Sequence, residues 1–251
     1  MPTLPKISII TIVYNGVSTI EKTIKSIAAQ SYPNVEYIVV DGGSNDGTID
    51  IVKNYSNSVS KWVSEPDKGI YDAMNKGITL SSGDYLWFIN SGDEVYAPDT
   101  LQRIFNPNNS PFHDIYYGDT VMIDSEGKEI GNRRLTPPSS LSWRDFRNGM
   151  LVSHQSIIVS KKVASTYNTR YKFSADFEWC LLAMKKADRV INTHQILSRF
   201  LDGGITKQNI TAGLKERFRI MSHYFGLTPT IFRHVAIGSR FLLFLLKNRR
   251  F

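Results

Sequence analysis

Short apolar runs alternate with amphipathic segments through the first half of the chain. Four apolar runs have the length of buried strands: residues 7–13, 35–40, 59–63 and 85–89. Three segments between them place apolar side chains at helical spacing: residues 18–30, 48–55 and 70–78. Strands that alternate with helices in this way are typical of a mostly parallel sheet joined by crossover helices. The pattern therefore predicts an α/β fold.

The second half of the chain is less regular. Strands are expected at residues 114–117, 120–123 and 156–159, and a helix at residues 175–186. The stretch 124–150 is predicted to be irregular, with a hairpin around Ser125-Glu126-Gly127. A chain of 251 residues is long enough for one large α/β domain with an appendage. We predict a domain over residues 1–210 and a helical tail over residues 211–251.

The tail carries the whole formal net charge of +7. Residues 212–251 contain eight Lys or Arg and one acid, Glu216, so the rest of the chain is formally neutral. A nucleic-acid enzyme would spread basic residues over its working face, so no nucleic-acid partner is predicted. The single cysteine, Cys180, cannot form an intrachain disulfide, and the N-terminus lacks a signal-peptide pattern. A cytoplasmic protein is therefore expected.

Basic side chains recur every seven residues in the tail, at Arg233, Arg240 and Lys247, which places them on one stripe of a helix. The longest unbroken apolar run, residues 241–246, is too short to span a bilayer. A helix at a membrane surface fits this pattern, as does packing on another chain. An ordinary core helix with extended Lys and Arg side chains is the alternative. We favour a peripheral location at the inner face of the cell membrane, because the basic C-terminus would attract anionic lipid.

A glycine-rich turn follows the second predicted strand, in residues 41–48 (DGGSNDGT). Open α/β sheets bind ligands in the crevice at the carboxyl ends of their strands. Asp41 would face this crevice and is a candidate for ligand binding. The alternative is that Asp41 opens an Asx-turn.

The fourth predicted strand leads to the same edge of the sheet and ends in Asn90-Ser91-Gly92-Asp93. A carboxylate there can hold Mg²⁺ or Mn²⁺, since such cations prefer oxygen ligands shared between carboxylates and substrate phosphates. The alternative is a turn acid, with Gly92 supplying a positive φ.

Several segments together resemble family 2 glycosyltransferases. They are residues 7–15, 41–48, 65–77 and 88–93, in that order. The long segment 65–77 resembles the exopolysaccharide, or colanic-acid-type, subgroup, as do Ser153-His154-Gln155 and residues 174–178. The resemblance extends over residues 6–206.

The resemblance implies a GT-A fold, a nucleotide-diphosphate sugar donor, a divalent metal (Mg²⁺ or Mn²⁺) and inversion at the anomeric carbon. Carried over by position, the donor-binding residues would be Thr11, Tyr14, Asp41, Asp67, Asn90 and Asp93. Within this set Thr11, Tyr14 and Asp41 would line the nucleoside pocket, and Asp93 would hold the metal and diphosphate. Asp176 would be the general base. The commonest family pattern has two or three acids after the fourth strand, whereas here Asn90 and Gly92 leave only Asp93. This departure predicts metal binding that is weaker, more dependent on the donor phosphates, or partly dispensable.

Three of these candidates have ordinary structural alternatives. Asp67 precedes a helix whose N-terminus favours phosphate, but it could equally be a cap. Asp176 lies in the first turn of a helix, where the helix dipole stabilises any acid. His154 could contact the acceptor or a phosphate, or it could bond a backbone carbonyl.

The predicted function is transfer of a sugar to a hydroxyl of a glycan acceptor, which we expect to be lipid-linked, in surface polysaccharide biosynthesis. The alternative is a non-catalytic protein that binds nucleotide-sugars or glycans on the same scaffold. Its only support is that residues 90–93 contain one acid where the family pattern has two or three. A dinucleotide-dependent oxidoreductase is disfavoured. Residues 13–17 (VYNGV) stand where Gly-x-Gly-x-x-Gly would follow the first strand.

Overall fold

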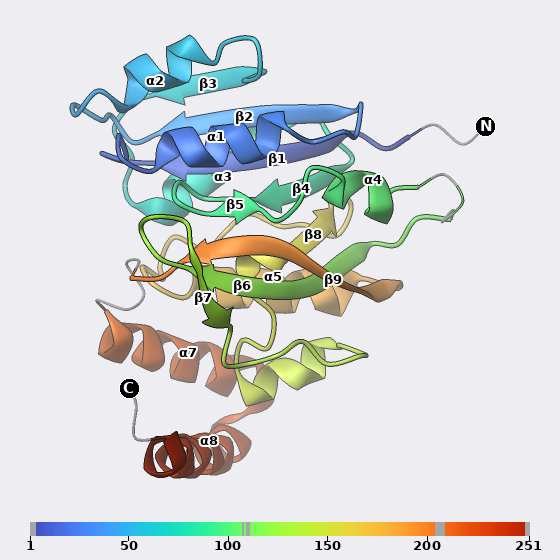
Figure 1. Ribbon diagram of the computed structural model, residues 1–251. Coiled ribbons are helices and arrows are strands. Elements are labelled where there is room, and N and C mark those ends of the chain that lie inside the picture. The colour runs from blue at the N-terminus through green and yellow to red at the C-terminus, as the bar shows by residue number, and fades with distance from the viewer. Residues whose placement is uncertain (1–3, 107, 109–110, 204–208, 249–251) are drawn as a thin grey trace.

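The computed structural model describes residues 4–248 except 107, 109–110 and 204–208, with side chains through residue 236 and at 238–239. The described residues form one mixed sheet with helices on both faces (Figure 1). The strand order is β3-β2-β1-β4-β8-β6-β9-β5, and β7 pairs with β6. The predicted α/β class is therefore confirmed.

The first four strands of the chain are parallel. They are β1 (Ile7–Val13), β2 (Val35–Asp41), β3 (Lys61–Ser64) and β4 (Tyr85–Phe88). Their side chains alternate between the two faces, and both faces are covered by helices, so β1, β2 and β4 are apolar almost throughout. This half of the sheet follows the predicted pattern.

The remaining strands make the other half of the sheet mixed. They are β5 (Glu94–Val95), β6 (Ile115–Ile123), β7 (Glu129–Asn132), β8 (Ile157–Ser160) and β9 (Val190–Leu201). Strand β8 runs antiparallel to both β4 and β6, whereas β6 and β9 are parallel. The predicted hairpin is present between β6 and β7, with Gly127 at φ 88°. The predicted strands at 114–117 and 120–123 are one strand, β6.

Helices cover each face of the sheet. One face packs against α1 (Ile20–Ala28), α2 (Thr48–Asn54) and α4 (Thr100–Ile104). The other packs against α3 (Ile70–Leu80), α5 (Ala175–Lys186) and α7 (Ile210–Phe225). Two 3₁₀ turns, η2 (Trp143–Asn148) and η3 (His154–Ser156), lie in the stretch before β8.

The predicted boundary after residue 210 does not coincide with a break in packing. Ile220 and Met221 of α7 are buried in the same apolar cluster as α3 and α5. The Glu216 carboxylate also accepts the backbone N–H groups of Lys172 and Phe173, each at 2.8 Å. Helix α7 is therefore part of the folded body of the protein.

The final helix, α8 (Leu227–Asn248), follows α7 at the end of the molecule farthest from β3 (Figure 1). Arg233 of the predicted basic stripe donates to Asn148 Oδ1 at 3.3 Å, so it contacts the body of the protein. The side chains of Arg240, Lys247 and residues 241–246 lie outside the described part of the chain. Within the described residues, none of the helices has the length and apolar character needed to cross a membrane.

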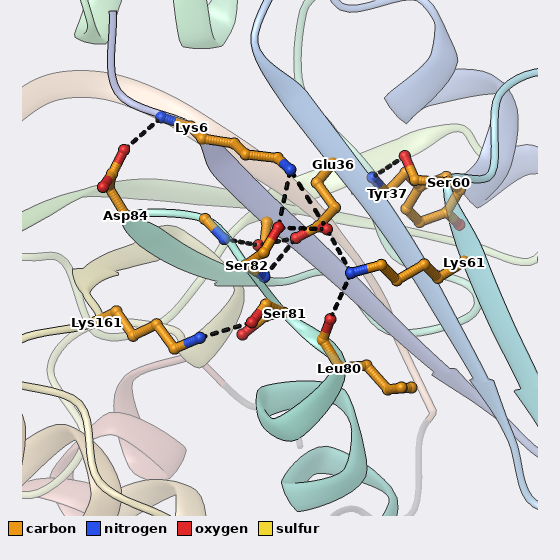
Figure 2. Close-up of polar contacts among 12 residues, drawn as sticks. Lys6, Glu36, Tyr37, Ser60, Lys61, Leu80, Ser81, Ser82, Asp84 and Lys161 are labelled. Carbon is orange, nitrogen blue, oxygen red and sulfur yellow. Dashed lines mark hydrogen bonds and ion pairs between the residues drawn. The ribbon is translucent and has the colours of Figure 1, made fainter.

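A buried carboxylate joins the amino-terminal ends of the parallel strands (Figure 2). Glu36 of β2 accepts the Ser8 hydroxyl of β1 at 2.6 Å and the backbone N–H of Ser82, just before β4, at 2.7 Å. Lys61 of β3 forms an ion pair with it at 2.8 Å, and Lys6 lies at 3.5 Å. Burial disfavours the charged carboxylate, but the hydrogen bonds from Lys61, Ser8 and Ser82 outweigh it and hold the pKa of Glu36 well below its usual range.

We expect Glu36→Gln to lower the free energy of unfolding by about 2 kcal/mol at neutral pH, because charge-assisted hydrogen bonds are lost. The folded-state pKa is depressed, so this stabilisation is present above the unfolded value of about 4.3 and declines as the pH falls below it. Urea unfolding of both proteins at neutral and acidic pH measures the difference. Glu126→Gln, at an exposed turn, is the matched control. An equal effect from the two substitutions would contradict the role given to Glu36.

Candidate active site

The loops after the parallel strands gather at one edge of the sheet. Strands β1, β2, β3 and β4 point in the same direction, so their carboxyl ends meet there. Tyr14 follows β1, Asp41 ends β2, Asp67 follows β3, and Asn90 and Asp93 follow β4. The topology therefore brings together five of the predicted donor-binding residues.

Asp41 is fully buried, and its carboxylate shapes the loop after β2. One oxygen accepts the backbone N–H groups of Gly43 and Ser44, which forms the Asx-turn that the sequence offered as the alternative. The same oxygen accepts the Ser64 hydroxyl at 2.6 Å. The other oxygen accepts the Ser44 hydroxyl. These contacts bind the loop to the end of β3. A direct contact with a nucleoside stays a prediction.

Tyr14 and Asp67 meet at Gly42. A Cβ atom at Gly42 would lie 2.5 Å from Asp67 Oδ2 and 3.4 Å from Tyr14 Cδ2, so only glycine lets the three loops come this close. The Tyr14 side chain is 66% exposed, which leaves an aromatic face open beside the loop. Asp67 Oδ1 accepts the N–H of Gly69 at 2.8 Å, just before α3, so the turn role of Asp67 is present too.

Thr11 lies in the interior of the protein. Its side chain has no exposed surface, because it lies on the same face of β1 as Ile9 and Val13, and this face is packed against α1. Its hydroxyl donates to the Ile89 carbonyl at 2.7 Å and accepts the Tyr37 hydroxyl at 3.1 Å. This arrangement joins three strands and directs Thr11 away from the crevice. The predicted contact with the nucleoside has no geometric support here.

Asp93 is a buried carboxylate, 5% exposed, in the turn after β4. Oδ1 accepts the backbone N–H of Leu201 at 3.0 Å, and Oδ2 accepts the Gln155 side-chain amide at 2.9 Å. Gln155 is held in turn by the Ser153 hydroxyl, which donates to its Oε1 at 2.8 Å. Burial raises the pKa of Asp93 to about 7, and the hydrogen bonds from Leu201 and Gln155 oppose that rise.

The oxygen ligands around Asp93 suit a cation that is bound partly by the protein and partly by substrate phosphates. Among the described residues, no group of three or more His, Cys, Asp or Glu side chains could enclose a metal ion. Asn90 Oδ1, however, is buried and lacks a hydrogen-bond partner within the described part of the chain. One carboxylate and one amide oxygen fit Mg²⁺ or Mn²⁺ when phosphates and water supply the remaining ligands.

Asp176 lies at the start of α5 and is partly exposed. Its Oδ1 accepts the Tyr71 hydroxyl of α3 at 3.1 Å and the backbone N–H of Phe177 at 2.9 Å. Burial raises the pKa of Tyr71, so its hydroxyl stays protonated and able to donate. Tyr71 therefore fixes one oxygen of Asp176.

His154 is a structural residue that supports this contact. Its Nε2 lies 2.7 Å from the Tyr167 hydroxyl, and the Tyr167 ring stacks on Tyr71 with centroids 5.7 Å apart. Burial lowers the pKa of His154 to about 4, so the ring is neutral near pH 7. Among the alternatives left open for His154, the geometry favours the structural one, although its partner is a side chain.

The chain matches a known family over most of this region. The sequence model of glycosyl transferase family 2 matches residues 8–168. The chain belongs to this family. An uncharacterized glycosyltransferase of Mycobacterium tuberculosis is 35% identical over 191 residues, which cover 73% of this chain and 70% of the relative. The chain is therefore a family 2 glycosyltransferase.

Solved glycosyltransferases share its fold. S. aureus TarS 1–349 in complex with UDP-GlcNAc aligns with a TM-score of 0.66 at 16% identity, over 92% of this chain and 73% of TarS 1–349. A mannosyltransferase of Pyrobaculum calidifontis in complex with GDP-Man and Mn²⁺ aligns with a TM-score of 0.62 at 16% identity, over 95% and 76% of the two chains. The predicted GT-A fold is confirmed.

Two residues that hydrogen-bond the candidate carboxylates, Tyr71 to Asp176 and Gln155 to Asp93, are absent from the predicted site. Both lie in segments that carry the family resemblance, residues 65–77 and 153–155, and this was the only signal in the sequence. Their partners are 105 and 62 residues away in the chain, so local spacing could not identify them.

The raised pKa of Asp93 predicts that its charged carboxylate destabilises the folded, metal-free enzyme. The unfolded pKa is about 3.9, so the charged group destabilises the fold increasingly as the pH rises from about 4 to about 7. We expect Asp93→Asn to raise the free energy of unfolding by about 2–4 kcal/mol near pH 8 in EDTA, with the gain vanishing below about pH 4. Asp50→Asn, on the exposed side of α2, is the control. A pH-independent difference, or a less stable Asn variant at pH 8, would contradict this assignment.

Proposed function

We propose that this glycosyltransferase moves a sugar from a nucleotide-diphosphate donor to a hydroxyl of a glycan acceptor, with inversion at the anomeric carbon. One observation carries the proposal: two successive residues of η3 connect the two candidate carboxylates. Gln155 bonds Asp93 directly, and His154 reaches Asp176 through Tyr167 and Tyr71. An enzyme that joins donor and acceptor needs such a fixed relation between its two binding groups.

On the donor side, the loops after β1, β2 and β3 would hold the nucleoside. Tyr14 offers an exposed ring beside Gly42, and Asp67 presents a carboxylate to the same place. The complexes of TarS with UDP-GlcNAc and of the Pyrobaculum mannosyltransferase with GDP-Man support a nucleotide-diphosphate sugar donor. The Mn²⁺ in the latter complex supports a divalent metal.

At the diphosphate, Asp93 and Asn90 would hold the cation. When bound, Mg²⁺ or Mn²⁺ neutralises negative charge on the departing diphosphate. The burial of Asp93 favours its pairing with a cation, since a buried carboxylate without one is costly. Gln155 and the Leu201 N–H keep both carboxylate oxygens oriented.

On the acceptor side, Asp176 would take the proton of the attacking hydroxyl as general base. Tyr71 holds Oδ1, which leaves Oδ2 for the acceptor. The acceptor oxygen forms a bond to the anomeric carbon while the bond to the diphosphate oxygen breaks, and the proton passes to Asp176. Attack opposite the leaving group inverts the configuration.

The acceptor would be a lipid-linked glycan used in surface polysaccharide synthesis, as expected for the exopolysaccharide subgroup. Exposed apolar side chains on the last two helices support a peripheral location at the inner face of the cell membrane. They are Ile210 and Leu214 on α7 and Leu227, Ile231, Phe232 and Val235 on α8. A surface helix that buries such side chains among lipid headgroups needs no membrane-spanning segment.

A thermal-shift panel of UDP, GDP and dTDP, alone and as their sugars, with and without Mn²⁺, tests donor binding first. We expect one nucleotide family to raise the melting temperature, and more so with Mn²⁺, because the bound state is stabilised by mass action. The absence of any shift would contradict the enzyme proposal.

With the donor identified, Asp176→Asn should lower the transfer rate by about 10²–10⁴-fold, the usual contribution of a general base, while donor affinity is unchanged. Tyr71→Phe should cost about tenfold, since it removes one hydrogen bond to Asp176 and leaves the stacked ring in place. Unchanged biological function in Asp176→Asn would favour the non-catalytic alternative.

A further inference from the structure

Two arginines from the second half of the chain each have one guanidinium nitrogen that is buried without a hydrogen-bond partner among the described residues. Arg133 follows β7, and Arg217 is on α7. Arg133 Nη1 and Arg217 Nε are both buried, and neither has a hydrogen-bond partner among the described residues. Buried polar groups are nearly always hydrogen-bonded, so each of these nitrogens calls for an explanation. A bound anion would supply the partner that each nitrogen lacks.

The charges of these side chains influence one another. Burial, followed by repulsion from Arg217, lowers the pKa of Arg133 to about 10, whereas attraction from Asp176 raises it. Arg133 contacts the fold through Nη2, which donates to the Met150 carbonyl at 2.7 Å. No salt bridge within the described part of the chain neutralises either arginine. Two neighbouring cations without a carboxylate partner are costly unless an anion binds between them.

A cavity of about 360 Å³ lies beside Arg133. Its lining is mixed: Asn132, Thr136 and Ser153 add neutral polar groups, Asp119 adds one acid, and Leu135, Pro137 and Ile196 are apolar. Ser153 leads back to the other carboxylate, since its hydroxyl holds Gln155, which bonds Asp93. The cavity therefore lies beside Arg133 and beside Ser153, the residue that orients Gln155.

The arginines belong to the acceptor side of the molecule. The candidate nucleoside contacts follow β1, β2 and β3, while α7 lies beyond the opposite part of the sheet (Figure 1). Leu214, one helical turn before Arg217, is 51% exposed, which places apolar surface next to the cation. A phosphate attached to a lipid would match both features, because guanidinium groups bind phosphate oxygens with two parallel hydrogen bonds.

We propose that Arg133 and Arg217 bind a phosphate of the acceptor, at the link between its glycan and its lipid carrier. This assignment rests on the proposed transfer reaction and extends it to the recognition of the acceptor. The phosphate neutralises the arginine pair and orients the glycan so that its hydroxyl reaches Asp176. The nucleotide-sugar donor does not use this pair.

Titration calorimetry with inorganic pyrophosphate tests the site, in EDTA to weaken any metal-dependent binding near Asp93. We expect Arg217→Gln and Arg133→Gln each to raise the pyrophosphate Kd by about tenfold or more, since each removes charge-assisted hydrogen bonds. Arg219→Gln, an exposed arginine on the same helix, should leave the Kd unchanged. The Kd for the nucleoside diphosphate that wild type binds should be the same in all three variants.

Each other outcome overturns the assignment. Unaltered pyrophosphate affinity in a folded Arg217→Gln variant, or no binding by wild type, would mean that the pair is structural. Equal loss of pyrophosphate and nucleotide affinity would mean that the arginines bind the diphosphate of the sugar donor instead. Arg133→Gln also loses the contact with Met150, so Arg217→Gln decides if the former fails to fold. Nucleotide binding by wild type tests the proposed function separately, so failure of one does not imply failure of the other.

Discussion

Hydrogen bonds to the Asp93 carboxylate connect three segments that are far apart in the sequence. It lies in the turn after β4, accepts the backbone N–H of Leu201 at the end of β9, and accepts the side chain of Gln155 in η3. Gly92 makes this approach possible. It has φ 98°, and a Cβ atom there would lie 2.7 Å from Leu201 Cδ2. The parallel and mixed halves of the sheet are thereby joined at the crevice, around a carboxylate whose charge the fold disfavours in the absence of a cation.

The surroundings of Asp176, the proposed base, are connected to η3 as well. His154 precedes Gln155, and its contacts continue through Tyr167 and Tyr71 to Asp176. Most of these groups are buried and aromatic, so their positions are set by close packing, and a shift of η3 would move both carboxylates together. The two ends of the sheet thus differ in purpose. The amino-terminal end holds the Glu36 ion-pair network, which stabilises the fold, while the carboxyl-terminal end carries a buried acid that costs stability.

The parallel half of the fold could be predicted because β1, β2 and β4 are apolar on both faces and because a turn and a helix separate successive strands. Strand β9 could not. It includes Thr193, His194 and Gln195, with His194 at φ 53°, and its pairing with β6 shifts register at that point. The positions of Asp93 and Asp176 followed from the family resemblance, but the residues that orient them did not. Thr11 is an example. Strand alternation places it on the same buried face of β1 as Ile9 and Val13, so the periodicity argues against the nucleoside contact that its place in the family motif implied.

Asp93 is the residue on which the donor side of this account depends, and binding of Mn²⁺ tests it most directly. Electron paramagnetic resonance can measure free Mn²⁺ in the presence of wild type or Asp93→Asn, with and without the nucleoside diphosphate that the enzyme binds. A site with one carboxylate should bind Mn²⁺ weakly alone and much more tightly with the nucleotide, and the Asn variant should lose that gain. Equal nucleotide-dependent Mn²⁺ binding by the two proteins would contradict the account.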